Sequence, residues 1–118
     1  MKILIVEDNA KMQDMIHNIL MHGLGKVGAI HRCRDGQEAV DLYEILKPDW
    51  VLMDIRLELM NGLTASRKIK AEHPDAKIII VTHYADAAYR EKAKNIGVCA
   101  YVLKESLSDL PILIKSIL

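Results

Sequence analysis

The first apolar run of the chain reads Ile3-Leu4-Ile5-Val6 and ends directly in two acids, Glu7-Asp8. A continuous run of aliphatic residues is typical of a strand that is buried on both faces, as the strands of parallel sheets are. Short β-rich apolar runs, most of them near-continuous, recur four more times, and each is followed by apolar residues spaced as on a helix. This alternation predicts an α/β fold: a five-stranded parallel sheet, doubly wound, built from five (βα) units.

We predict strands over residues 3–6, 27–33, 50–53, 77–81 and 98–103, and helices over 9–21, 37–46, 63–72, 87–96 and from 110 onward. Pro48 and Pro74 mark the ends of the second and third helices, because a proline disfavours helical conformation in the residue before it. Gly97 suits the left-handed conformation that closes the fourth helix. In the first helix, the apolar spacing places Met15 toward the core and Gln13 toward solvent.

The length of 118 residues fits a single domain over 1–118, and an apolar content of 51% is enough to fill its core. Sixteen Lys and Arg balance sixteen Asp and Glu, which argues against nucleic-acid binding through bulk charge. Cys33 and Cys99 lack the spacing of a metal site or a disulfide framework, so we expect small buried residues in a reducing compartment. No apolar run is long enough for a signal peptide or a membrane span, and we expect a cytoplasmic protein without membrane contact.

Candidate site residues follow the first, third, fourth and fifth predicted strands. Glu7-Asp8 come after the first strand, Asp54 after the third, Thr82 after the fourth and Lys104 after the fifth. In a doubly wound sheet the carboxyl ends of the strands form the ligand site, so we expect these side chains to meet. Three clustered carboxylates repel one another unless they take up protons or bind a cation, and an all-oxygen ligand set favours Mg²⁺ or Mn²⁺ over zinc. A carboxylate beside such an ion, facing a lysine and a threonine, is suited to accept a phosphoryl group.

With these residues in place, the chain resembles the receiver domain of two-component response regulators over essentially its whole length. Five motifs carry the resemblance: Ile3-Leu4-Ile5-Val6-Glu7-Asp8-Asn9, Val51-Leu52-Met53-Asp54-Ile55, Met60-Asn61-Gly62, Ile80-Val81-Thr82 and Ala100-Tyr101-Val102-Leu103-Lys104. The resemblance implies a single receiver domain over 1–118 with a flavodoxin-like sheet in the strand order 2-1-3-4-5.

The resemblance also implies a role for each acid. Asp54 is expected to be the phosphoacceptor, and its donor is expected to be a sensor histidine kinase or a phosphotransfer protein. Asp8, Asp54 and the backbone carbonyl of Arg56 are expected to bind Mg²⁺ directly, and Glu7 to bind it through a water molecule.

The remaining site residues are expected to respond to the phosphoryl group. Lys104 pairs with it, while Thr82 and Tyr101 move toward it as the switch that alters the face formed by the fourth helix, the fifth strand and the fifth helix. Arg56 and Tyr84 stand where relatives tune the lifetime of the phosphorylated state. One departure concerns Glu105, which follows the lysine where the family usually has a cis proline, so the loop that carries Lys104 lacks that rigid element.

Several outputs stay open at this point. The favoured one is transcription regulation through an attached DNA-binding domain, in which case this chain is the N-terminal part of a longer response regulator and contacts no DNA itself. The alternatives are a stand-alone receiver that acts by protein contact, with or without homodimer formation on phosphorylation, and an unphosphorylated docking module. In the last helix, Ile112, Ile114 and Leu118 form an apolar surplus that favours an interface there. We expect no enzyme beyond slow self-dephosphorylation, because aspartyl phosphatases need a second acid where Arg56 stands.

Overall fold

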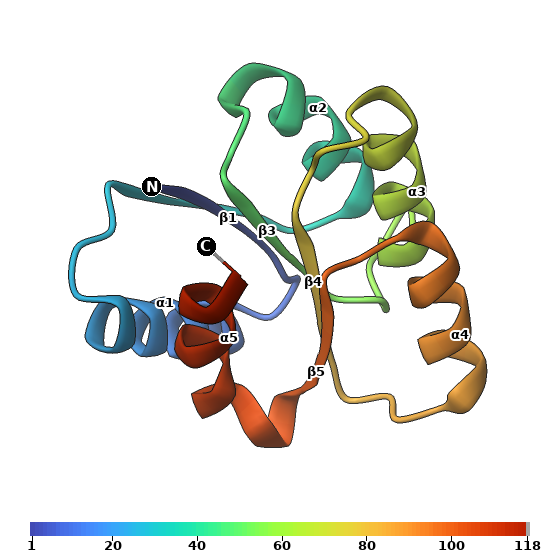
Figure 1. The fold of residues 1–118 in the computed structure, drawn as a ribbon. Coiled ribbons are helices and arrows are strands. Elements are labelled where there is room, and N and C mark those ends of the chain that lie inside the picture. Colours follow the sequence, from blue (N-terminus) through green and yellow to red (C-terminus); the bar gives the residue numbers. More distant parts are fainter. Residues whose placement is uncertain (118) are drawn as a thin grey trace.

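The computed structural model describes residues 1–117, and it contains the predicted parallel sheet. The strands are β1 (Lys2–Val6), β2 (Ala29–Cys33), β3 (Trp50–Met53), β4 (Ile78–Thr82) and β5 (Ala100–Leu103), in the order β2-β1-β3-β4-β5. The helices are α1 (Ala10–Leu24), α2 (Gly36–Leu46), α3 (Gly62–Glu72), α4 (Ala87–Ile96) and α5 (Leu110–Ile117), and a short 3-10 helix, η1 (Lys104–Asp109), precedes α5. In Figure 1, α1 and α5 lie on one face of the sheet and α2, α3 and α4 on the other. The predicted fold class and strand order are confirmed.

The sheet separates two hydrophobic cores because successive side chains of a strand point to opposite faces. In β1, Ile3 and Ile5 pack into the core under α1 and α5, whereas Leu4 and Val6 pack into the core under α2, α3 and α4. All four side chains are fully buried or nearly so. Burial on both faces is why β1, β3 and β4 read as near-continuous apolar runs, whereas β2, at the edge of the sheet, is only partly buried and contains His31 and Arg32.

Side-chain caps start three helices close to the carboxyl ends of the strands. Asn9 accepts a hydrogen bond from the backbone N–H of Met12, Asp35 from that of Glu38, and Asn61 from those of Leu63 and Thr64. Such caps satisfy N–H groups that have no partner inside the helix. They therefore hold the connections that follow β1, β2 and β3 in defined positions around one edge of the sheet.

Gly62 allows α3 to begin directly against the end of β3. A Cβ atom at this position would lie 1.7 Å from the carbonyl oxygen of Asp54, and the N–H of Gly62 donates to the carbonyl of Ile55 over 2.8 Å. No side chain fits in that space, so the glycine sets the distance between α3 and the segment that carries Asp54.

Some predicted boundaries were wrong by a few residues. The first helix continues to Leu24, because Gly25 with φ of 72° is the first residue to leave the helical conformation. The second strand begins only at Ala29, which is paired with Lys2. The segment from Lys104 to Asp109, which we expected to be a loop, forms η1. The closing of α4 by a left-handed Gly97 is confirmed.

Two predictions of side-chain burial in α1 were also wrong. Ile16 and Leu20 define the buried stripe, and Met15 lies about 100° around the helix from Ile16, so half of its surface is exposed. Gln13, expected in solvent, falls on the buried stripe and is 8% exposed. Its amide donates to the carbonyls of Glu7 and Cys33, which explains why a polar residue stands there.

Other departures concern the edges of the fold. Cys99, expected to be buried, is exposed: it lies directly before β5, an edge strand with a neighbour on one side only. Cys33 is buried as predicted. In α5, Ile112 is 69% exposed but Ile114 is fully buried in the core under α1. Leu118 lies outside the described residues, so of the three predicted residues Ile112 alone is exposed among those that the structure describes, and Ile117 of the same helix is partly exposed as well. Between residues 1 and 117, no helix has the length and apolarity that crossing a membrane requires.

Candidate functional site

Three carboxylates meet at the carboxyl edge of the sheet. Glu7 and Asp8 follow β1 and Asp54 follows β3, and these two strands are neighbours. One carboxylate oxygen from each residue lies within 4.8 Å of the other two. Glu7 and Asp54 are buried, whereas Asp8 is partly exposed. The structure therefore brings together the three acids that the sequence predicted as a cluster.

Lys104 reaches into this cluster from the end of β5. Its ammonium nitrogen lies 2.5 Å from Glu7 Oε1 and 2.9 Å from Asp54 Oδ2, and its side chain is 6% exposed. Burial alone would lower the pKa of Lys104, but the contacts with both carboxylates outweigh burial and raise it. Glu105 does not disturb this arrangement, because its carboxylate turns outward to His83 over 3.5 Å.

The charges of the cluster do not cancel. Burial raises the pKa of Glu7, and the nearby Asp8 and Asp54 raise it further, although Lys104 lowers it. Lys104 pairs with two of the three carboxylates, Glu7 and Asp54, which leaves an excess of negative charge within this mostly buried cluster. A divalent cation would remove that excess, and the exclusively oxygen donors fit Mg²⁺ or Mn²⁺. The donor chemistry of the site thus agrees with the predicted metal.

A cavity of about 320 Å³ opens over the carboxylates. Asp8, Asp54 and Arg56 line it, so the side chain of the predicted phosphoacceptor is reached from solvent through this cavity. The exposed Met15 lies at the same cavity, which the helical spacing of α1 did not indicate. The cavity makes Asp54 accessible to a ligand from solvent, although the residue is 6% exposed.

Both oxygens of the Asp54 carboxylate have partners. Oδ1 accepts a hydrogen bond from the backbone N–H of Ile55 over 2.7 Å, and Oδ2 accepts one from Lys104. Each partner fixes one oxygen of the carboxylate, and Asp54 as a whole is 6% exposed. The side chain is therefore held in one orientation before any ligand binds.

The predicted switch residues contact one segment after β4. The hydroxyl of Thr82, fully buried, accepts from the N–H of Tyr84 over 3.4 Å, and the hydroxyl of Tyr101 donates to the carbonyl of Tyr84 over 2.5 Å. Two arginines stack on the rings of these tyrosines. The guanidinium of Arg56 lies 5.1 Å from the ring centre of Tyr84, and the guanidinium of Arg90 lies 4.6 Å from the ring centre of Tyr101. The sequence did not indicate a role for Arg90. A charged residue on the exposed face of a helix has the same sequence pattern whether or not it stacks on an aromatic ring.

Comparisons with known proteins agree with this geometry. A family model described as the response regulator receiver domain matches residues 3–115. The transcriptional regulatory protein PdtaR of Mycobacterium tuberculosis is 35% identical over 111 residues, which cover 92% of this chain and 52% of that protein. The chemotaxis protein CheY of Thermotoga maritima is 35% identical over 103 residues, covering 87% of this chain and 84% of that one.

Among solved structures, a DNA-binding response regulator of the LuxR family from Staphylococcus aureus superposes with a TM-score of 0.90 at 31% identity. The match covers 98% of this chain and 97% of that chain. A CheY-like receiver domain protein from Methanospirillum hungatei gives a TM-score of 0.88 at 28% identity, covering 98% and 91% of the two chains. This chain spans about half the length of several curated relatives that it matches, including PdtaR and the Bacillus subtilis regulator LnrK.

Proposed function

This chain belongs to the response regulator receiver domain family, and on that premise we propose that Asp54 accepts a phosphoryl group from a phosphohistidine of a sensor histidine kinase or phosphotransfer protein. One observation carries the proposal: Asp54 shares a solvent-open cavity with two further carboxylates, and Lys104 lies 2.9 Å from its Oδ2. In the transfer, a carboxylate oxygen of Asp54 forms a bond to phosphorus as the bond from phosphorus to the donor imidazole breaks. The imidazole leaves with that electron pair and takes a proton.

Asp8 and Asp54, with the backbone carbonyl of Arg56 and with Glu7 acting through water, are the groups that would hold Mg²⁺. Bound Mg²⁺ would supply positive charge that offsets the charge of the phosphoryl oxygens and the carboxylates. Lys104 supplies a second positive charge through its contact with Asp54 Oδ2. Glu7 keeps Lys104 in place, because the ion pair between the Glu7 carboxylate and the Lys104 ammonium is buried.

The switch rests on Thr82 and Tyr101. A phosphoryl group on Asp54 adds negative charge and strong hydrogen-bond acceptors, which attract the hydroxyl of Thr82. Thr82 and Tyr101 are both tied to the backbone of Tyr84, so a movement of one alters the segment that holds the other. The change passes to α4, which follows that segment, and to β5, which carries Tyr101.

Arg56 and Tyr84 both line the cavity over Asp54, and they are stacked on one another. We propose that this pair limits the approach of water to the phosphorylated aspartate, so that self-dephosphorylation is slow. No other enzymatic activity is proposed. The residue two positions after Asp54 is an arginine, which cannot act as the general acid of an aspartyl phosphatase.

We favour transcription regulation as the output, exerted through a DNA-binding domain outside this chain. Relatives that are named transcriptional regulators support this, because the chain covers only about half of their length. A stand-alone receiver that acts by protein contact is the second candidate, favoured by the match to most of the Thermotoga maritima chemotaxis protein CheY. Homodimer formation on phosphorylation is compatible with either output.

The test is intact-mass spectrometry of the protein after incubation with acetyl phosphate, with and without Mg²⁺. The wild type should gain a single phosphoryl adduct only with Mg²⁺, and Asp54→Asn should gain none. Asp75→Asn removes an exposed aspartate away from the cluster and should behave as the wild type. An adduct of equal yield on Asp54→Asn, or none on the wild type with Mg²⁺, would refute the proposal and favour an unphosphorylated docking module.

A further inference from the structure

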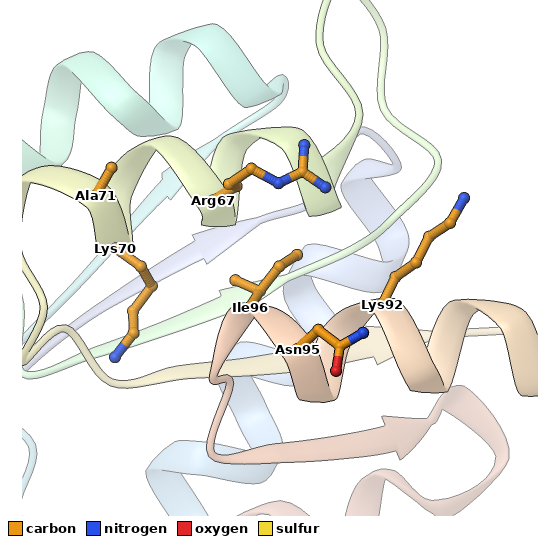
Figure 2. Close-up of a pocket in the computed structure, with 6 residues that line it drawn as sticks. All are labelled: Arg67, Lys70, Ala71, Lys92, Asn95 and Ile96. Carbon is orange, nitrogen blue, oxygen red and sulfur yellow. The ribbon is translucent and has the colours of Figure 1, made fainter.

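A second cavity lies between α3 and α4, away from the site described above. It has a volume of about 460 Å³, within the range of small-molecule sites, and it shares no lining residue with the cavity over Asp54. Its walls are formed by Arg67, Lys70 and Ala71 of α3 and by Lys92, Asn95 and Ile96 of α4 (Figure 2). We call it the α3–α4 groove.

The groove concentrates positive charge in a chain that is neutral overall. The two helices that form it carry six basic residues against two acidic ones: Arg67, Lys68, Lys70, Arg90, Lys92 and Lys94 against Glu72 and Glu91. The whole chain has equal numbers, sixteen of each. A concave surface of one sign of charge raises the local concentration of ligands of the opposite sign. An anion is therefore the ligand that this surface favours.

The basic side chains of the groove differ in what they contact. Lys70 donates to the backbone carbonyls of Pro74 and Ala76 over 2.6 and 3.1 Å, so it holds the end of α3. Arg67 and Lys92 are exposed and, within residues 1–117, form neither an ion pair nor a side-chain hydrogen bond. In Figure 2 their charged ends extend toward the same end of the groove, while Lys70 extends the other way.

The rest of the groove supplies an amide and an apolar wall. Asn95 lines the groove between the two helices and has no side-chain hydrogen bond among the described residues. Ile96 projects from α4 toward α3, and Ala71 lies on the facing helix (Figure 2). A ligand in the groove thus meets uncommitted donors at one end and apolar surface beside them.

We propose that the α3–α4 groove binds a small organic phosphate, of the chemical class of a nucleoside monophosphate. The phosphate lies between Arg67 and Lys92 and accepts from Asn95, and the organic part packs on Ile96 and Ala71. A phosphate fits better than a carboxylate because the planar guanidinium, the ammonium and the amide together can serve three oxygens, and a carboxylate has two. Such a ligand contacts both α3 and α4. It would add contacts to α4, a helix in which Ala93 is the buried residue.

The test is a titration of the full chain, free of Mg²⁺, with adenosine monophosphate and separately with inorganic phosphate, followed by amide NMR spectra. We expect saturable shifts at Arg67, Asn95 and Ile96, and tighter binding of adenosine monophosphate than of inorganic phosphate. The double variant Arg67→Gln/Lys92→Gln should weaken adenosine monophosphate binding by about tenfold or more, since two charge-assisted contacts are lost.

A matched control separates this site from general charge attraction. Lys68 and Lys94 are exposed on the same two helices but do not line the groove, so Lys68→Gln/Lys94→Gln should weaken binding less than about twofold. Equal weakening in both double variants would overturn the proposal, and so would shifts centred on the cavity over Asp54. Equal affinity for adenosine monophosphate and inorganic phosphate would overturn the assignment of an organic ligand.

Discussion

Asp8→Asn should stabilise the metal-free protein. Asp8 places a carboxylate oxygen within 4.8 Å of both Glu7 and Asp54, whereas Lys104 pairs with those two acids and has no contact with Asp8. In the unfolded chain Asp54 is far from Asp8, so their repulsion acts on the folded state alone, whereas Glu7 is the sequence neighbour of Asp8 in both states. Replacing Asp8 by its neutral isostere therefore removes the repulsion with Asp54 and part of that with Glu7, and it breaks no ion pair among the described residues.

The size of the effect follows from the separation. Two unit charges 4.8 Å apart repel by about 0.9 kcal/mol in water and by about 3.5 kcal/mol at an effective dielectric constant of 20. Asp8 is partly exposed, so screening by solvent brings each pair toward the lower figure. The pair with Asp54 dominates, because the repulsion with Glu7 persists in part after unfolding, and we expect the free energy of unfolding to rise by about 1 kcal/mol at pH 7.5.

Urea unfolding in EDTA and in saturating Mg²⁺ measures this directly. In EDTA the variant should unfold at higher urea than the wild type. Mg²⁺ should stabilise the wild type, by about 2.7 kcal/mol at a hundred times its dissociation constant, and the variant much less because it lacks a ligand. Asp75→Asn should match the wild type in both buffers. If Asp8→Asn unfolds earlier than the wild type in EDTA, the cluster is not repulsive and the argument for a bound cation fails.

Three further results are expected. Lys104→Met should lower the free energy of unfolding by about 3 kcal/mol at pH 7.5 in urea titrations, since Glu7 then stays buried without its cation. The pKa of Lys104 is raised above its usual value of 10.5, so the stability that the lysine contributes is complete below pH 10.5 and is lost as the pH rises above it. A wild type whose free energy of unfolding does not fall in that alkaline range would contradict the ion pair. Gly62→Ala should cost about 3 kcal/mol in the same titrations, because its Cβ would lie 1.7 Å from a backbone oxygen, and a loss under 1 kcal/mol would show that α3 can move aside. Burial raises the pKa of Cys33 to about 12 while Cys99 is exposed, so a thiol reagent at pH 8 should label one cysteine in the native protein and both after denaturation.

The layout of this protein can be predicted from its sequence to a large extent. The apolar runs predicted the strands within a few residues, most directly for β1, β3 and β4, because burial on both faces demands near-continuous apolar segments. β2, which contains His31 and Arg32, is only partly buried. The acids and the lysine could be assigned to one edge, since the carboxyl ends of parallel strands share it. Gly97 could be assigned to the end of α4, because few other residues adopt a positive φ without strain.

Other features depend on contacts between segments that are far apart in the chain. Lys104 is bound to Glu7 across 97 positions of sequence, and this pairing holds the lysine although Glu105 follows it. Gln13 is buried because the carbonyls of Glu7 and Cys33 need a donor at that point, which no periodicity reveals. The α3–α4 groove likewise exists only where two helices face each other. Hydrophobic periodicity reports how much of each segment is buried, whereas the pairing of charges and donors depends on distances that are set when the helices pack on the sheet.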